Sequence, residues 1–283
     1  MMARSGPTVR QRRLATELRK LRELQGITGE QAARRVGWQP SKISRIEHCT
    51  SHVKATDLIA LLDAYEVSEK VRQDLITLQA SAREQGWWDV YDNLPSDYAG
   101  YISLESDAAA IRCYSMQLVH GLLQTEEYAR AVIEATMMSQ EPAEEIDRRV
   151  EVRMTRQAVL GKPEPLRIHS IIDEAALRRV MGDPKVMIEQ CAHLLAQARQ
   201  PHVTIQILPH DTGAHPAVVG PFAILNFPGP HPDVVYIETL ASSIYIEAET
   251  EVHRYNLVFD HLSKMALNPD DSLTFLHIIA TVT

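Results

Sequence analysis

The densest group of hydrogen-bonding side chains lies in one short segment near the start of the chain. Lys42 and Arg45 can donate to the guanine acceptors in the major groove, and Gln39 can pair with adenine. The hydroxyls of Ser41 and Ser44 can reach phosphate oxygens. This set of donors predicts a surface that reads double-stranded DNA. The alternative is an ordinary solvated helix face of mixed charge.

The spacing of apolar residues predicts the helices that must hold this segment. Leucines at helical spacing indicate a first helix over about residues 9–25. Thr28 is a good cap for a second helix, Gly29–Val36, because a glutamine follows three positions later in capping-box spacing. Pro40 fits the first position of a third helix, where its missing N–H is not needed. Two more amphipathic helices complete a predicted five-helix, all-α domain over residues 1–86.

The second and third predicted helices are joined by a turn that contains a glycine, which is typical of a helix-turn-helix. In the third helix, Ile43 and Ile46 are expected to face the core, while the polar residues, including Glu47, are expected to face outward. The residues expected to bind DNA are Thr28, Gln39, Ser41, Lys42, Ser44 and Arg45.

Charge is divided unevenly along the chain. Residues 1–54 hold 12 basic and 4 acidic residues, whereas the whole chain has 29 Lys plus Arg against 37 Asp plus Glu, a net charge of −8. A basic front on an acidic body is typical of proteins in which one part contacts nucleic acid, and the alternative is a merely solvated basic tail. The sequence shows no signal peptide and no membrane-length apolar stretch, and its three cysteines are scattered. It therefore predicts a cytoplasmic protein with no membrane partner.

Residues 87–283 are predicted to form a second domain of the α+β class. Apolar alternation indicates strands at about residues 166–172, 203–207, 222–227, 234–237 and 244–246. Helical spacing indicates helices at about residues 125–138, 142–160, 174–181, 184–200 and 249–267. Several short connections between the strands predict a mostly antiparallel sheet with helices on one side.

The second domain carries few residues patterned for catalysis. A loop-like group of histidines invites a metal site, but its spacing matches no metal-binding pattern; its members are His202, His210, His215 and His231. Two carboxylate pairs, at residues 126–127 and 173–174, lie near arginines that favour structural ion pairs over acid–base chemistry. There is no nucleophile elbow, P-loop or dinucleotide fingerprint. We therefore expect no catalytic residue, no metal, no cofactor and no enzymatic activity.

Residues 27–47, which read ITGEQAARRVGWQPSKISRIE, resemble the DNA-binding core of the Xre-type (lambda-repressor-like) regulators, most strongly in the run SKISRIE. The resemblance implies a lambda-repressor-like domain that binds double-stranded DNA. Gly29 stands where the family usually has a glutamine that bonds a phosphate, and Cys49 stands where it usually has a helix-ending glycine. Residues 50–53 lack the arginines that often touch the DNA backbone. These departures predict weaker DNA binding than that of a typical member.

The rest of the chain resembles the long C-terminal domain, of uncharacterised function, that follows such a head in a large regulator family of filamentous spore-forming bacteria. The resemblance is carried by residues 121–130, 153–157, 173–178, 208–216 and 220–222. It implies a regulator of development or antibiotic production whose gene commonly adjoins one for a small acidic partner protein. Such a pairing is antitoxin-like.

A glycine- and proline-rich loop, Gly213–Gly220, follows one of the predicted strands and suits a recognition pocket. The alternative is a loop that merely connects two strands. The residues expected to line a ligand or partner pocket are Gln124, Tyr128, Arg153, His215 and Phe222.

Together these features predict a sequence-specific transcriptional regulator that binds DNA as a homodimer. Its C-terminal domain is expected to sense a small-molecule effector or a partner protein. An alternative is an antitoxin-like module whose main task is to bind a protein, with DNA binding secondary. A hydrolase or transferase fused to a DNA-binding head ranks last, because no catalytic pattern supports it.

Overall fold

The computed structural model describes residues 9–51, 53–81, 87–91, 94–137, 142–228, 232–240 and 242–282. The chain divides into two compact units, Met1–Leu104 and Glu105–Thr283. The sequence placed the change of domain between residues 86 and 87. Because residues 82–86 lie outside the described part, that boundary stays a prediction.

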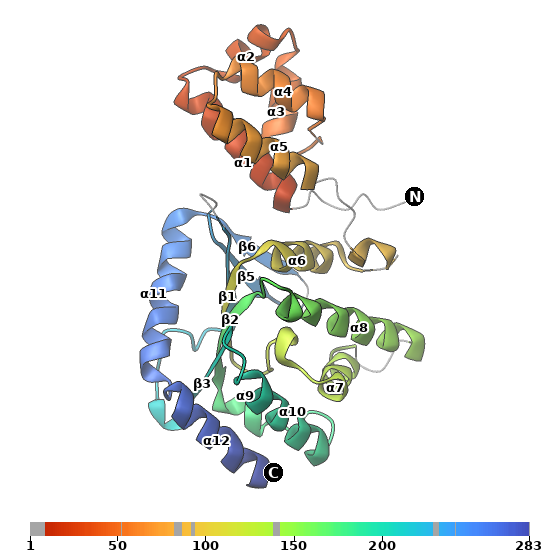
Figure 1. The fold of residues 1–283 in the computed structure, drawn as a ribbon, viewed down its shortest axis with the longest axis vertical. Coiled ribbons are helices and arrows are strands. Elements are labelled where there is room, and N and C mark those ends of the chain that lie inside the picture. Colours follow the sequence, from red (N-terminus) through yellow and green to blue (C-terminus); the bar gives the residue numbers. More distant parts are fainter. Residues whose placement is uncertain are drawn as a thin grey trace. The chain divides into compact units, whose positions relative to one another are not determined.

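The N-terminal unit contains the predicted run of short helices (Figure 1). They are α1 (Val9–Leu24), α2 (Gly29–Val36), α3 (Pro40–Glu47), α4 (Ala55–Ala64) and α5 (Glu69–Ser81). A 3₁₀ turn, η1 (Trp87–Val90), and helix α6 (Ser96–Asp107) follow along the chain. The first five helices confirm the predicted all-α domain.

Local sequence explains where α2 begins and ends. The hydroxyl of Thr28 accepts a hydrogen bond from the Gln31 amide at 3.2 Å, and the Gln31 side chain accepts one from the Thr28 amide at 2.7 Å. This is the predicted capping box, which satisfies two amides that the helix cannot. The helix ends at Gly37, whose φ of 73° is left-handed and suits glycine.

One apolar core holds the five helices together. Ala32 and Ala33 of α2 are fully buried, and they pack in the same cluster as Ile43 and Ile46 of α3. Small alanine side chains allow the two helix axes to approach closely at the turn. The core therefore fixes the angle at which α3 leaves α2.

A six-stranded mixed sheet forms the centre of the C-terminal unit. Its order is β3-β2-β1-β4-β5-β6, with β1 parallel to β2, β2 parallel to β3, and the other three pairs antiparallel. The strands are β1 (Ala110–Ser115), β2 (Arg167–Asp173), β3 (Val203–Leu208), β4 (Phe222–Asn226), β5 (Val234–Glu238) and β6 (Ser243–Ile246). The predicted α+β class with a mostly antiparallel sheet is confirmed, and β1, which the sequence analysis left undefined, lies at its centre.

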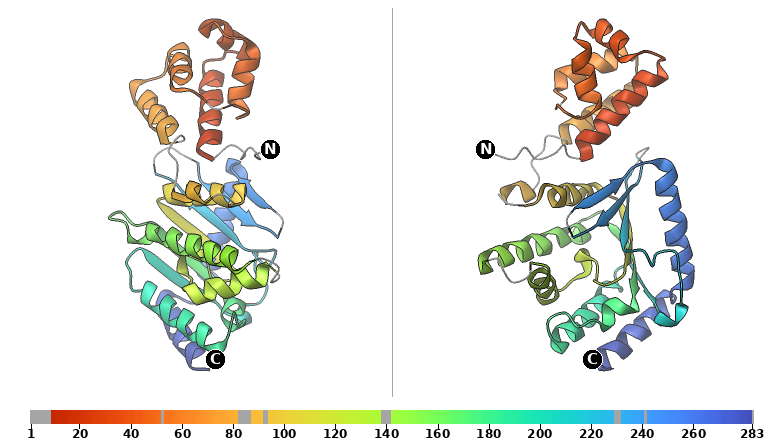
Figure 2. Two further views of the ribbon diagram at one scale, coloured as in Figure 1. Left: turned by 90° about the vertical axis from the view of Figure 1, so that its right-hand side faces the viewer. Right: turned by 180° about the vertical axis from the view of Figure 1, so that it is seen from behind.

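Helices cover both faces of this sheet, so the expectation of helices on one side was wrong (Figures 1 and 2). One face carries α7 (Glu126–Thr136), α8 (Ala143–Arg156), α9 (Glu174–Arg178) and α10 (Pro184–Gln197). The other face carries α11 (Glu249–Met265), and α12 (Pro269–Val282) contacts both α10 and β3. Three 3₁₀ turns complete the unit: η2 (Gly121–Leu123), η3 (Gln157–Gly161) and η4 (His210–Thr212). Two covered faces explain why most strand residues are apolar.

No helix in the described part of the chain combines the length and the apolar character that crossing a bilayer requires.

Candidate nucleic-acid interface

Helix α3 presents a row of polar side chains on one side and its apolar residues on the other. Gln39, Ser41, Ser44 and Arg45, here called the reading face, are all exposed, whereas the two isoleucines of α3 are buried. The Gln39 side chain makes no hydrogen bond to the helix that it precedes. The guanidinium of Arg45 makes no ion pair within the described residues. The Gln39 and Arg45 donors are therefore available for base edges and phosphates, while the Ser44 hydroxyl lies 3.4 Å from His48 Nδ1 on the same exposed face.

Lys42, the second cation predicted to contact guanine, is engaged inside the domain. Its ammonium donates to Asp57 Oδ1 at 2.7 Å and lies 3.6 Å from the centre of the Trp38 ring. The Lys42 side chain is 33% exposed and that of Asp57 is 17% exposed. Since Asp57 belongs to the first turn of α4, this contact ties α3 to α4 and orients the reading face.

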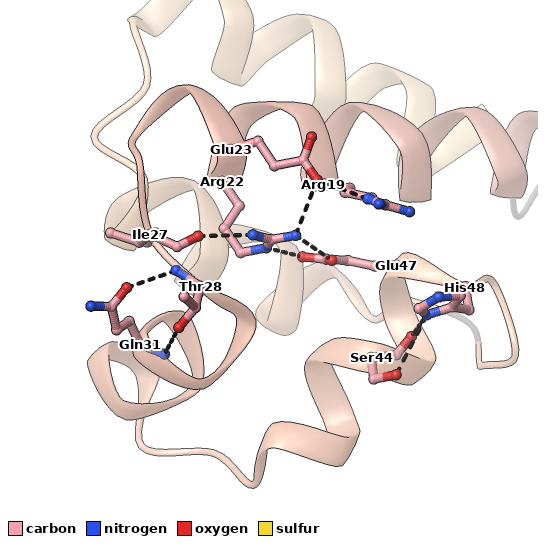
Figure 3. Close-up of polar contacts among 9 residues, drawn as sticks. All are labelled: Arg19, Arg22, Glu23, Ile27, Thr28, Gln31, Ser44, Glu47 and His48. Atoms are coloured by element: carbon pink, nitrogen blue, oxygen red, sulfur yellow. Dashed lines mark hydrogen bonds and ion pairs between the residues drawn. The ribbon is translucent and has the colours of Figure 1, made fainter. Parts of the chain in front are cut away.

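Glu47, expected on the outside of α3, is instead buried against α1 (Figure 3). Both of its carboxylate oxygens accept from Arg22, at 2.6 Å from Nε and 2.9 Å from Nη2, and the two side chains are only 7% and 11% exposed. A third donor of Arg22, Nη1, binds the carbonyl of Ile27 at 2.8 Å. The hydrogen bond with Glu47 raises the pKa of Arg22 above its ordinary value. This guanidinium joins α1, the entry to α2 and the end of α3.

Thr28, also predicted to bind DNA, has its hydroxyl in the capping box of α2 (Figure 3). Its side chain is exposed, so the hydroxyl oxygen can still donate its proton to a phosphate while it accepts from the helix. The amides at the start of α2 add a positive helix end beside it.

The end of α3 forms a Schellman motif without the usual glycine. Cys49 has a φ of 55°, its amide binds the Ile46 carbonyl at 3.0 Å, and the Thr50 amide binds the Arg45 carbonyl at 2.9 Å. His48 Nδ1 adds a hydrogen bond to the Ser44 carbonyl at 2.8 Å. The helix thus ends as the family pattern implies, in a conformation that disfavours cysteine.

Two family models match this chain. A helix-turn-helix domain matches residues 13–75, and a domain of unknown function (DUF5753) matches residues 98–277. The chain belongs to the DUF5753 family. No curated protein and no solved structure matches its sequence. The helix-turn-helix match, with the exposed reading face, indicates that this DUF5753 protein is a DNA-binding regulator.

In the C-terminal unit of the DUF5753 protein, three of the five predicted pocket residues share a hydrogen-bond network. Gln124 donates to the Val119 carbonyl at 2.7 Å and accepts from Arg153 Nη1 at 3.0 Å. The hydroxyl of Tyr128 accepts from the Val119 amide at 3.2 Å. Gln124 and Tyr128 are buried, and Arg153 is half-buried. Pocket lining by these residues stays a prediction.

The other two predicted pocket residues surround Tyr114, near the carboxyl ends of β1 and β2. The ring centres of His215 and Phe222 lie 5.5 Å and 6.3 Å from that of Tyr114. The Tyr114 hydroxyl donates to Asp173 Oδ2 at 2.9 Å and lies 3.5 Å from His215 Nε2. Burial and the hydrogen bond to Asp173 raise the pKa of Tyr114 above its ordinary value.

The histidine group and the two carboxylate pairs singled out in the sequence gain no further metal-binding or acid–base residues among those that the structure describes. Within the described ranges, no three His, Cys, Asp or Glu side chains are grouped to hold a metal ion, and His231 lies outside those ranges. Glu174 pairs with Arg178 one turn along α9, and Glu126 lies 3.8 Å from Arg130 on α7. The sequence favoured buried ion pairs, whereas Arg178 is 53% exposed and Glu126 is 61% exposed, so both pairs lie at the surface.

The residues that hold the reading face in place were not predicted from the sequence. Arg22, Trp38 and Asp57 contact the DNA-reading segment from other elements. The position of Trp38, two residues before α3 begins, was a local signal for such a role.

Proposed function

We propose that this protein is a sequence-specific transcriptional regulator of the Xre type that binds operator DNA as a homodimer. The observation that carries the proposal is the reading face, which is exposed on the second helix of a helix-turn-helix. The resemblance of residues 27–47 to Xre-type regulators supports docking of α3 in the major groove.

In this proposal, two copies place their α3 helices about 34 Å apart, one turn of the duplex, on a pseudo-palindromic site. The C-terminal unit changes DNA affinity by binding a small molecule or a partner protein better in one state than in the other. Such coupling requires two states with unequal affinity for DNA.

The operator can be found by selecting genomic fragments that the purified full chain retains. Affinity for the selected duplex is then measured by fluorescence anisotropy for the parent protein and for Arg45→Ala. Loss of an arginine that reads guanine should weaken binding about tenfold or more. The matched control is Arg72→Ala, because Arg72 lies on α5, away from α2 and α3, and is ion-paired with Asp63. Equal affinity of the Arg45 variant and the parent for the operator would refute the assignment of the reading face as the DNA-contacting surface.

A second candidate function is an antitoxin-like module whose main partner is a protein. The engagement of Lys42 with Asp57 and Trp38 favours it, because this removes one cation from the DNA-facing set. The ratio of affinities for operator and random duplexes separates the two. A ratio of about a thousand or more, with a steep salt dependence, supports the regulator, and a ratio near one supports the protein-binding module.

We also propose that the chain is not an enzyme. Support comes from the sequence, in which the motifs for a nucleophile elbow, a phosphate loop and a dinucleotide site do not occur.

A further inference from the structure

Helix α8 carries four arginines, and one of them differs from the rest. Arg148 and Arg149 pair with Glu145, and Arg156 pairs with the buried Glu105 at 2.7 Å. Arg153 has no carboxylate within ion-pair distance among the residues that the structure describes. A half-buried guanidinium without a counter-ion is unusual, because desolvated charges are normally paired.

The donors of Arg153 are also only partly used. Its Nη1 binds the Gln124 side-chain oxygen at 3.0 Å, whereas its Nε is buried and has no hydrogen-bond partner in the described part of the chain. The Gln124 amide is fixed in this orientation, since its nitrogen donates to the Val119 carbonyl at 2.7 Å. A neutral amide oxygen satisfies one N–H of Arg153 but does not neutralise its charge.

Neighbouring groups add a hydrogen-bond donor, and among the described residues no carboxylate comes within ion-pair distance of Arg153. The Tyr128 hydroxyl accepts from the Val119 amide, and its own proton has no acceptor among the described residues. Burial, together with the nearby charges of Arg156 and Arg153, lowers the pKa of His120 to about 3. His120 is therefore neutral at physiological pH. Arg153 therefore keeps an uncompensated positive charge, and its Nε–H and the Tyr128 hydroxyl proton are unused donors among the described residues.

We propose that Arg153 anchors a binding site for a small anion, a molecule that carries a carboxylate or a phosphate group. Both groups accept bidentate hydrogen bonds from a guanidinium. A free small molecule is the fitting occupant, because an acceptor must enter the unit to reach the buried Nε. This inference deepens the sensing role under the proposed function and rests on it for its regulatory meaning, although the binding can be measured separately.

The test is isothermal titration of the full chain, at pH 7 and constant ionic strength, with acetate, citrate and inorganic phosphate as probes and chloride as the background ion. Saturable binding of at least one probe is expected. Preference for acetate or citrate identifies a carboxylate ligand, and preference for phosphate identifies a phosphate ligand. The absence of saturable binding for all three probes overturns the proposal.

Three variants tie the binding to this residue. Arg153→Gln should lower the affinity for the bound probe about tenfold or more, because it removes the charge and the bidentate donors. Arg153→Lys keeps the charge without the planar fork and should fall between this variant and the parent. Arg149→Gln is the matched control on the same helix, because Arg149 already has Glu145 as its partner. Undiminished binding in both Arg153 variants, or equal loss in the Arg149 variant, overturns the assignment.

Failure of this site and failure of the DNA-binding proposal give different results. Arg45→Ala should lose operator affinity and keep anion binding. Arg153→Gln should lose anion binding and keep operator affinity in the absence of added anion. Circular dichroism and thermal unfolding show that each variant keeps its fold.

Discussion

Cys49 ends α3 in a left-handed backbone conformation, with a φ of 55°. In this region the Cβ of a non-glycine residue crowds the neighbouring carbonyl, which costs about 1–2 kcal/mol. Cys49→Gly should therefore stabilise the protein by about 1 kcal/mol, once the greater flexibility of unfolded glycine is included. Urea unfolding followed by circular dichroism measures the change.

The neighbouring residue provides the control for Cys49. His48 has a φ of −96°, which any residue adopts, so His48→Gly gains nothing from glycine and loses the His48 hydrogen bond to Ser44. It should lower stability. A Cys49 glycine variant that is less stable than the parent would contradict the strain argument.

Glu47 contributes to stability through a pair of nearly buried charges. Glu47→Gln removes the carboxylate that binds two nitrogens of Arg22 and leaves, among the described residues, only the exposed Glu23 near the guanidinium, and the loss of one partner from such a pair costs about 3 kcal/mol. Thermal and urea unfolding should show this loss. Glu23→Gln is the matched control, because exposed Glu23 lies 3.5 Å from the same guanidinium and its removal should change stability little. Equal effects of the two substitutions would exclude a special role for Glu47.

At the scale of elements, the contact between Lys42 and Asp57 should couple α3 to α4. A double-mutant cycle with Lys42→Met and Asp57→Asn should give a coupling energy of about 0.5–1 kcal/mol in urea unfolding. Lys42→Met should also reduce operator affinity less than Arg45→Ala does, because Lys42 acts by orienting α3. Zero coupling, or a larger loss of affinity for the Lys42 variant, would return Lys42 to the DNA-contacting set.

Elements with local signals were predictable, and elements without them were not. The bounds of α2 followed from Thr28, Gln31 and Gly37, which act within a few residues of the helix. The sequence left residues 102–114 open between helix and strand, because β1 (Ala110–Ser115) begins two residues after α6 and contains Arg, Cys and Ser in place of a β-branched run. Helix α12 was also missed, although Pro269 and two following aspartates are a helix-start signal.

In the candidate DNA-binding site, too, the features set by local sequence were predictable and the contacts between distant residues were not. Exposure of the reading face follows from helical periodicity, which puts Ile43 and Ile46 on the opposite side. The partners of Lys42, Glu47 and Arg153 lie between 15 and 29 residues away in sequence, on other elements. Such contacts depend on tertiary packing, which a single sequence does not display.

The whole molecule should lose stability in mild acid. Burial lowers the pKa of His120 to about 3, and it also lowers the pKa values of His169 and His193. Below about pH 6.5 the unfolded chain binds protons that the folded chain does not, and each fully shifted histidine then removes up to about 1.4 kcal/mol per pH unit. Urea midpoints should fall between pH 7.5 and pH 5.

His120→Asn tests the largest of these contributions. In the parent protein the Leu122 amide donates to His120 Nδ1 at 3.3 Å. An asparagine side chain can keep an acceptor near this amide without titrating in this pH range. The variant should show a shallower fall in stability toward pH 5 than the parent does. Parallel curves for the two proteins would exclude His120 as the source.

Helix α12 covers β3, which is an edge strand of the sheet. The Ile207 amide on β3 donates to Ser272 Oγ at 3.0 Å, and the Ile207 carbonyl accepts from the Leu267 amide at 2.9 Å. Unpaired backbone groups on an exposed edge strand can pair with strands of other molecules, which promotes aggregation. A shortened protein that stops before Pro269 loses Ser272 and would uncover the Ile207 amide, so an intact α12 is a condition for keeping concentrated samples dispersed.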